Sequence, residues 1–170
     1  VTALGTEQGS GMMGWGSGTQ EVVGRWPTTC DLGPGIICTV AGDGIYDYNG
    51  NDIQATTARM RGPFGVCADA KGNIYFADSS NAIVRKIDRA TGSVVTVAGV
   101  AGSGGYNGDG IPATTATLGD PYDVAVDGAG NMYIVEMSGN RIRKVDAKTG
   151  LISTIAGTGV QCLSAANACG

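Results

Sequence analysis

The feature that most constrains this chain is an internal repeat with a period of 58 residues. Shifted by 58 positions, residues 63–99 align with residues 121–157 without a gap, and 15 of the 37 positions are identical. The shared positions include an Asp-x-x-Gly-Asn turn, a tyrosine, an Arg-Lys doublet and a closing Ala-Gly. A repeat of this length is usually one supersecondary unit that buries its apolar surface against its neighbours. The sequence therefore predicts two similar units that pack on each other.

Each unit contains four short runs of β-forming residues separated by Asp, Gly and Asn turns. Such runs at a spacing of about ten residues predict antiparallel strands. The predicted strands are 65–68, 74–77, 83–87 and 93–98 in the first unit, and 123–126, 132–135, 142–145 and 151–156 in the second. Residues 36–41 repeat the last run and predict one leading strand. Helical turns are expected only at residues 54–60 and 163–168.

The two units resemble the NHL repeat of β-propeller proteins. The resemblance rests on Pro-Tyr-Asp-Val-Ala-Val-Asp, Gly-Asn-Met-Tyr-Ile-Val, Asn-Arg-Ile-Arg-Lys-Val-Asp, Ile-Ser-Thr-Ile-Ala-Gly and the linker Tyr-Asn-Gly-Asp-Gly, and it covers about residues 36–160. It implies an all-β fold of antiparallel four-stranded blades. Propellers close with about four to eight blades. Two complete blades and a leading strand are therefore not expected to form a closed propeller on their own.

We expect six segments along the chain. They are a Gly-rich extension (1–35), a leading strand with its linker (36–62), a first blade (63–99), an interblade linker (100–120), a second blade (121–157) and a cysteine-containing tail (158–170). Much of the glycine that the repeat does not explain lies in the extension.

The Gly-rich extension carries apolar residues that predict packing on another surface. The candidates for assembly contacts are Met12, Met13, Trp15, Val22, Val23 and Trp26. One interpretation is a strand added to the open sheet edge of a neighbouring subunit. The other is an irregular lid over the chain's own blades.

The five cysteines suggest two local disulfides. Cys30 and Cys38 form one close pair, and Cys162 and Cys169 form another. Cys67 lies in an apolar run and is interpreted as a small buried hydrophobe. Two disulfides would favour an extracellular, secreted or cell-surface protein. The alternative is five reduced thiols in a cytosolic protein.

Composition excludes several functions. The chain has no histidine, which removes Ser-His-Asp and Cys-His catalysis and His-ligated zinc. The net charge of −4 and the pI near 4.6 argue against nucleic acid as a partner. No apolar run approaches 18 residues, so we expect no transmembrane helix. No cofactor and no catalytic residue are predicted.

One weak metal-binding candidate lies in the first linker. Asp47, Asn49, Asn51 and Asp52 place oxygen ligands close together, as calcium loops do. The second linker keeps only Asn107 and Asp109 of this pattern. The favoured interpretation is a hydrogen-bonded turn between blades.

Asp78 and Glu136 occupy equivalent positions after the second strand of each unit. Two carboxylates raise the possibility of acid–base catalysis. Because both units carry one, we interpret them as structural, holding turns or pairing with the Arg-Lys doublets. The doublets alternate with apolar residues, which is typical of a solvated strand face.

These observations favour a non-enzymatic structural protein that self-associates head-to-tail into an extracellular assembly or filament. The expected partner is an identical subunit, with a protein or glycan as a further possibility. The alternative is a ligand- or protein-binding NHL module that belongs to a longer array. An enzyme is disfavoured, because the NHL-like amidating lyases that the resemblance brings in depend on His-ligated metal.

Overall fold

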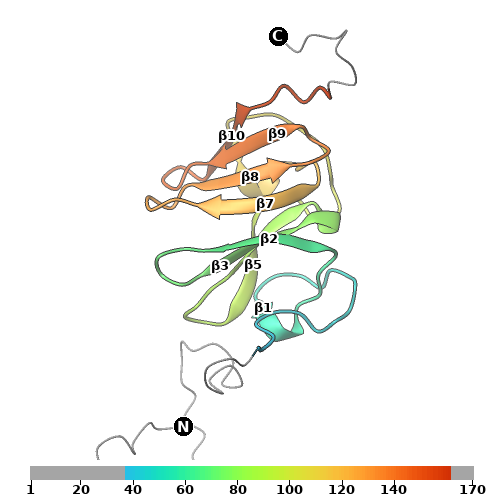
Figure 1. Ribbon diagram of the computed structural model, residues 1–170, viewed down its shortest axis with the longest axis vertical. Coiled ribbons are helices and arrows are strands. Elements are labelled where there is room, and N and C mark those ends of the chain that lie inside the picture. The colour runs from blue at the N-terminus through green and yellow to red at the C-terminus, as the bar shows by residue number, and fades with distance from the viewer. Residues whose placement is uncertain (1–36, 162–170) are drawn as a thin grey trace, which may run out of the picture.

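The computed structural model describes residues 37–161, which form two antiparallel β-sheets. The first sheet, blade 1, has the strand order β1-β5-β4-β3-β2, and the second, blade 2, has the order β6-β10-β9-β8-β7. The two blades lie one above the other, with β2 beside β7 (Figure 1). The fold is therefore all-β and propeller-like, as the repeat predicts.

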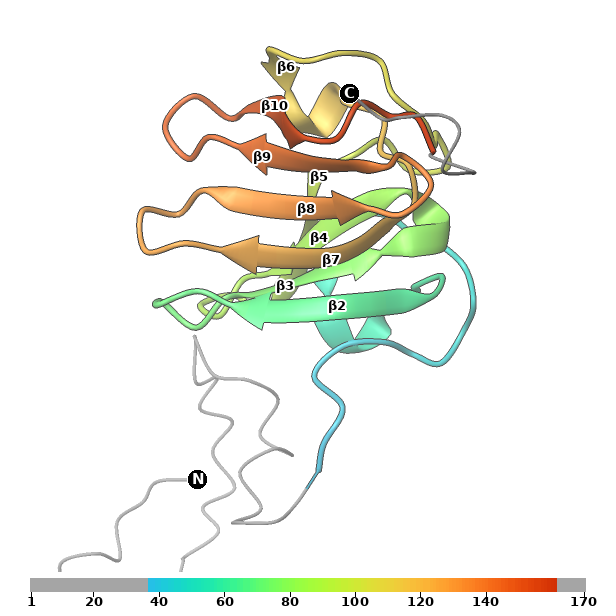
Figure 2. The same cartoon turned by 45° about the horizontal axis from the view of Figure 1, so that its top comes forward.

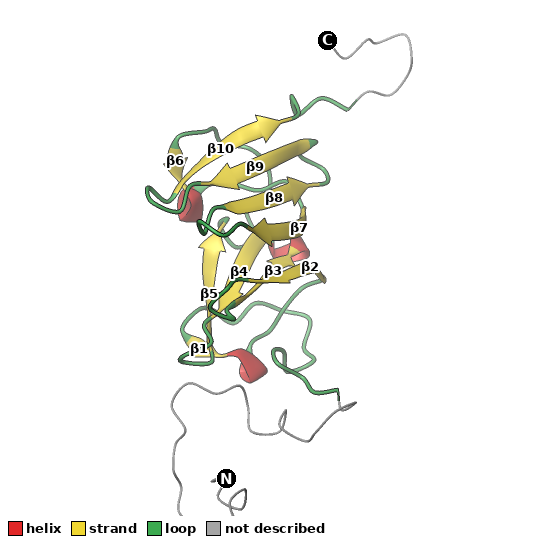
Figure 3. Cartoon of the chain, turned by 60° about the vertical axis from the view of Figure 1, so that its left-hand side comes forward, coloured by secondary structure: helices red, strands yellow, loops and turns green. Residues whose placement is uncertain are grey.

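The strand bounds repeat with the period of the sequence. Blade 1 contains β1 (Ile53–Gln54), β2 (Pro63–Ala68), β3 (Ile74–Asp78), β4 (Ile83–Ile87) and β5 (Ser93–Ala98). Blade 2 contains β6 (Ile111–Pro112), β7 (Pro121–Val126), β8 (Met132–Glu136), β9 (Arg141–Val145) and β10 (Leu151–Ala156). Three short 3-10 helices, η3 (Ala55–Thr57), η4 (Ser79–Asn81) and η5 (Ala113–Thr115), lie in the connections (Figure 3).

The four predicted strands of each unit are present. The first strand of each blade begins two residues earlier than predicted, at Pro63 and Pro121. In both cases the proline pairs with the last residue of the next strand, and the register then shifts before the regular ladder starts. This irregularity resembles a β-bulge. A prediction from runs of β-forming residues does not include such a bulge, so it places the start of the strand too late.

Each sheet also has a fifth strand that the sequence did not predict. β1 and β6 are two residues long and pair antiparallel with the start of β5 and β10. They come from the linkers and continue directly into η3 and η5. A strand of two residues is too short to show an alternating pattern in the sequence. One of the four residues in β1 and β6 is Pro112, and proline in a sheet is found at edges. These edge strands are therefore defined only by their pairing with β5 and β10.

The predicted leading strand is wrong over the part that the structure describes. Residues 37–41 form no strand there. Residues 39–42 repeat Thr96–Gly99, of which Thr96 and Ala98 belong to β5 and pair with β4. A strand needs a hydrogen-bonded neighbour, and no strand among residues 37–161 takes the place of β4 beside residues 37–41.

Asp-based turns close the hairpins of both blades on the same side (Figure 2). The Asp69 carboxylate accepts hydrogen bonds from the backbone N–H groups of Lys71 and Asn73 and from the Asn73 amide. Asp127 makes the equivalent bonds in blade 2. Side-chain bonds of this type fix a tight turn without help from the rest of the fold, which explains why the turn residues repeat.

The main hydrophobic core fills the space between the blades. Its members come from β4 and β5 of blade 1 and from the near side of blade 2, namely Val84, Ala98, Ala113, Ala116, Leu118, Val124, Met132, Ile134, Val145 and Ile152. A smaller core lies on the opposite side of blade 1 and contains Ala55, Ala58, Phe76, Ile87 and Val94. Each member of the smaller core has its repeat equivalent in the main one.

The strands β2 and β7, which we call the innermost strands, approach each other closely. A Cβ atom placed on Gly65 of β2 would lie 2.6 Å from the Cα atom of Asp123 in β7. Real Cβ atoms do not make such contacts, so glycine is required at this position. The repeat has Asp123 where blade 1 has Gly65, and this departure from the repeat is explained by the contact between the two strands.

Candidate functional site

A buried arginine holds each linker against its blade. The Arg85 guanidinium donates to the carbonyl oxygens of Gly50 at 2.6 Å and Arg59 at 3.0 Å. In blade 2, Arg143 donates to the carbonyl oxygen of Gly108 at 2.8 Å. Both arginine side chains have no exposed surface. The prediction that the Arg-Lys doublets are solvated is therefore wrong for the arginines.

A tyrosine ring covers each of these guanidinium groups. The Arg85 guanidinium lies 5.3 Å from the centre of the Tyr48 ring, and that of Arg143 lies 4.9 Å from the centre of the Tyr106 ring. These distances fit cation–π contacts. The contacts explain why the Tyr-Asn-Gly motif of the linker and the arginine of the third strand recur together in both repeats.

Asp78 and Glu136 lie beside these arginines. The shortest ion-pair distances are 3.7 Å between Arg85 Nη1 and Asp78 Oδ2, and 3.3 Å between Arg143 Nη1 and Glu136 Oε1. Asp78 also accepts hydrogen bonds from the backbone N–H of Arg61 and from the Asn81 amide. Burial raises the pKa of both carboxyls, against the opposing effect of these partners.

This arrangement is that of a structural support. Each carboxylate faces an arginine and has no exposed path to a substrate, since Asp78 and Glu136 are 0% and 2% exposed. The geometry supports the interpretation that both residues pair with the arginines of the doublets and, for Asp78, hold a turn within its own blade.

The weak calcium candidates lie in a linker whose oxygens already have protein partners. Asn49 bridges the linker by donating to the Thr57 carbonyl and accepting from the Arg59 N–H. Asn51 Oδ1 accepts from the backbone and hydroxyl of Thr96.

The two acidic candidates are also placed by protein contacts. Asp47 pairs with Arg59 at 3.3 Å, and Asp52 has a φ of 58° with its N–H donating to the Val94 carbonyl. Among the described residues, no group of three or more His, Cys, Asp or Glu side chains is placed to hold a metal ion.

The predicted disulfides and assembly residues fall mostly outside the described range. Cys30, Cys162, Cys169, Met12, Met13, Trp15, Val22, Val23 and Trp26 all lie outside residues 37–161. Cys38 is disulfide-bonded, and Cys67 is a half-buried free thiol. The pairings of Cys30 with Cys38 and of Cys162 with Cys169 therefore stay predictions.

Comparison of equivalent positions in the two blades identifies an exposed apolar surface, which we call the far face of blade 2. We define it by Val135, Ile142, Ile155 and Ala156, which correspond to Ala77, Val84, Val97 and Ala98 of blade 1. The blade 1 residues are buried or partly buried, because blade 2 covers them. In blade 2 the exposed fractions are 39% for Val135, 37% for Ile142 and 51% for Ile155.

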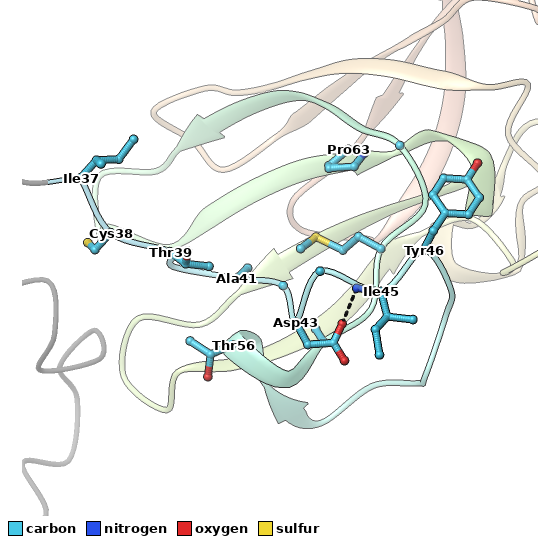
Figure 4. Close-up of a pocket in the computed structure, with 14 residues that line it drawn as sticks. Ile37, Cys38, Thr39, Ala41, Asp43, Ile45, Tyr46, Thr56 and Pro63 are labelled. Carbon is cyan, nitrogen blue, oxygen red and sulfur yellow. Dashed lines mark hydrogen bonds between the residues drawn. The ribbon is translucent and has the colours of Figure 1, made fainter.

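A second surface lies at the opposite end, against blade 1. Residues 37–46 run past the smaller core and leave a cavity of about 1090 Å³ between themselves and the blade. Figure 4 shows the segment with Thr39 and Ala41 running between Pro63 on one side and Thr56 on the other, with Ile45 and Tyr46 farther along it. We call this cavity the blade 1 groove. Its lining is predominantly apolar and contains one acidic residue, Asp43.

An exposed aromatic pair joins the two blades at their inner strands. The rings of Phe64 and Tyr122 stack with their centres 4.7 Å apart, and both side chains are exposed. The two residues occupy equivalent positions of the repeat. The recurrence of an aromatic residue there is the sequence pattern that could have identified this pair. Sequence reasoning did not single them out.

The chain is similar to proteins that contain NHL repeats. The family model of the Teneurin NHL domain matches residues 101–170. The chain is 28% identical over 113 residues to Protein SUPPRESSOR OF QUENCHING 1, chloroplastic, from Arabidopsis thaliana, and 29% identical over 111 residues to NHL repeat-containing protein 2 from Bos taurus. These matches cover 66% and 64% of this chain but only 10% and 15% of the two relatives.

A solved structure shows the same arrangement. It belongs to a structural-genomics protein of unknown function from Bacteroides thetaiotaomicron, with 32% sequence identity and a TM-score of 0.55. The match covers 61% of this chain and 26% of that protein. The helices within residues 37–161 have three residues each, too few for a membrane-spanning segment.

Proposed function

This chain is built of NHL repeats, and we propose that it acts as a non-enzymatic, protein-binding module of the β-propeller type. The observation that carries the proposal is the far face of blade 2. Its residues are exposed, while their equivalents in blade 1 are buried or partly buried beside the neighbouring blade. A contiguous apolar surface of this kind marks a site of protein contact.

The junction between the two blades supports a proposal for the partner of the far face. There, Val84 and Ala98 of blade 1 pack against Ala113, Ala116 and Leu118 of blade 2. Fully burying one aliphatic side chain stabilises a contact by roughly 1.5–3 kcal/mol. Ile142 and Ile155 are at least as large as the residues they replace. We therefore propose that a further blade docks on the far face through a similar alanine-rich surface.

A longer array tests this proposal directly. A second copy of residues 100–157 is inserted after Gly157, and amide hydrogen exchange is measured across β9 and β10. We expect slower exchange in both strands than in the original chain, because the added blade covers them. The same insertion in an Ile155→Asp background should lose most of this protection, whereas Ala129→Asp, in the exposed β7–β8 turn, should keep it. Unchanged exchange in β9 and β10 would contradict the proposal.

A second candidate is self-association of identical chains, head-to-tail, into an extracellular assembly or filament. The observation that favours it is that both ends of the two-blade unit are open, with the far face at one end and the blade 1 groove at the other. Head-to-tail contacts that do not close produce filaments. The extracellular location is proposed on the cysteine pairs alone.

Analytical ultracentrifugation of the full chain distinguishes this candidate. We expect the mean mass to rise with concentration for the wild type and for Ala129→Asp, and to stay that of a monomer for Ile155→Asp. A monomer at every concentration would reject self-association. That result would not bear on the docking of a further blade within a longer array, which the hydrogen-exchange experiment tests separately.

A further inference from the structure

The chain contains two Asn-Gly dipeptides, and they occupy the same place in the two linkers. They are Asn49-Gly50 and Asn107-Gly108. Asparagine is a thermolabile residue, because the backbone nitrogen of the following residue can attack its side-chain amide. Glycine in that following position favours the attack, since it has no side chain to hinder the approach of its nitrogen. Each linker therefore carries a chemically reactive dipeptide.

In the folded chain the asparagine amide is held at both ends. The Asn49 amide donates to the Thr57 carbonyl at 2.9 Å and accepts from the Arg59 N–H at 2.8 Å. Asn107 makes the equivalent two bonds in blade 2, at 3.0 Å and 2.8 Å. Both asparagines are exposed, so water reaches them. The attack requires the side chain to turn back onto its own backbone, and both hydrogen bonds must break before it can do so.

The glycine of each dipeptide is held by the buried arginine of the same blade. Arg85 donates to the Gly50 carbonyl at 2.6 Å, and Arg143 donates to the Gly108 carbonyl at 2.8 Å. The φ angles of 103° at Gly50 and 119° at Gly108 lie in a region that glycine adopts readily and other residues rarely do. The glycine nitrogen reaches the amide carbon only if the backbone rotates between the two residues. The bond from the arginine opposes this rotation.

We propose that Asn49 and Asn107 are deamidation sites, and that the buried arginine of the same blade controls how fast each one reacts. The reaction takes place when the linker opens locally. The Gly50 backbone nitrogen loses its proton to hydroxide and bonds to Cγ of Asn49. The bond between Cγ and Nδ2 then breaks, and Nδ2 leaves as ammonia after taking a proton from water. A second water opens the five-membered imide at either of its carbonyls, which gives aspartate or isoaspartate.

Either product prevents the linker from closing again as before. Aspartate places a carboxylate oxygen against the Thr57 carbonyl, where the amide of Asn49 donated, and two acceptors repel each other. Isoaspartate lengthens the backbone by one carbon atom just before Gly50, whose carbonyl has to meet Arg85. The modification is therefore one-way and accumulates each time a linker opens. It does not depend on the partner that the blades bind.

The test follows both sites in one sample of the full chain. The protein is kept in mildly alkaline buffer, and conversion at each asparagine is measured by mass spectrometry of its proteolytic peptides. In Arg85→Lys we expect Asn49 to convert roughly tenfold faster than in the wild type, as for the loss of one hydrogen bond to a charged group, with Asn107 unchanged. Arg143→Lys should give the reverse result.

Lys86→Arg is the matched control, because Lys86 pairs with Asp88 within blade 1 rather than with the linker. It should leave both asparagines at the wild-type rate. Circular dichroism at the incubation temperature checks that each variant is folded. Equal acceleration of both sites in a folded Arg85→Lys or Arg143→Lys would overturn the proposal.

A second comparison needs no variant. Synthetic peptides of residues 46–53 and 104–111 contain the dipeptides without the contacts that hold them. They should convert roughly tenfold faster, or more, than the same sites in the folded wild type, because only the locally opened chain reacts. Equal rates in the peptides and in the folded chain would overturn the proposal, and this comparison decides alone if a lysine variant does not fold.

Discussion

Arg143 and Glu136 form an ion pair of 3.3 Å in which neither side chain has exposed surface. The same arginine reaches the linker through the Gly108 carbonyl and the Asp109 carboxylate. Arg143 in β9 therefore fixes both the end of β8 and the linker that enters blade 2. Arg85 and Asp78 repeat this relationship in blade 1.

Loss of the arginine alone should destabilise the protein strongly. Arg143→Leu leaves Glu136 buried without its counter-charge, and removal of one partner from a buried pair typically costs about 3–5 kcal/mol. The measurement is the free energy of unfolding in urea at pH 7. The double variant Arg143→Leu/Glu136→Leu should cost less than the single one. Arg141→Leu, which removes a cation that stacks on Tyr106 at 4.0 Å, should cost less than about 1 kcal/mol. A double variant less stable than the single one would contradict this account.

Glycine at position 65 should be required for the contact between the innermost strands. In Gly65→Ala the added Cβ meets the backbone of Asp123, which cannot move aside as a flexible side chain would. We expect a loss of about 1–3 kcal/mol in the free energy of unfolding, as for other overpacked sites. Gly128→Ala is the matched control, because nothing lies within 4 Å of its Cβ position. Equal stability of the two variants would show that β2 and β7 separate easily.

The repeat predicted the main strands because local sequence determines them. The runs at Ile83–Ile87 and Leu151–Ala156 are bounded by Asp and Gly turns that form through their own hydrogen bonds. The edge strands β1 and β6 depend on pairing with β5 and β10, tens of residues away, and carry no local signal.

The buried arginines show a second limit of sequence reasoning. Arginine is mostly exposed in proteins, and its alternation with apolar residues resembled a solvated face. Its burial depends on carbonyl oxygens such as that of Gly50, which lies 35 residues earlier in the chain. Only the joint recurrence of Tyr-Asn-Gly and Arg in both repeats carried information about this contact.

The candidate surfaces were predicted only in outline. Counting blades indicated that apolar faces would be left open, and the far face of blade 2 is one of them. The groove depended on where residues 37–46 run, which the pattern of the leading strand described incorrectly.

The turn carboxylates should make the protein less stable in acid. Hydrogen bonds to Asp127, led by that from the Asn131 amide, lower the pKa of its carboxyl in the folded state. A carboxyl with a lowered folded-state pKa adds stability above its unfolded pKa of about 3.9, and this stability is lost as the pH falls through the folded value. The free energy of unfolding should therefore fall below about pH 4. Asp127→Asn should make this fall shallower. A pH profile unchanged by Asp127→Asn would contradict the assignment.

The stacked pair of Phe64 and Tyr122 should couple the two blades energetically. The rings lie 4.7 Å apart with an angle of 26° between their planes, and each comes from the innermost strand of its blade. A double-mutant cycle with Phe64→Ala and Tyr122→Ala should give a coupling free energy of about 0.5–1.5 kcal/mol. Because Phe64 belongs to β2 and Tyr122 to β7, this coupling measures how firmly one blade holds the other. Tyr46→Ala, which removes a similarly exposed ring that stacks on Arg61, should show no coupling to Tyr122→Ala. Additive effects of Phe64→Ala and Tyr122→Ala would mean that the blades are held together by the apolar core alone.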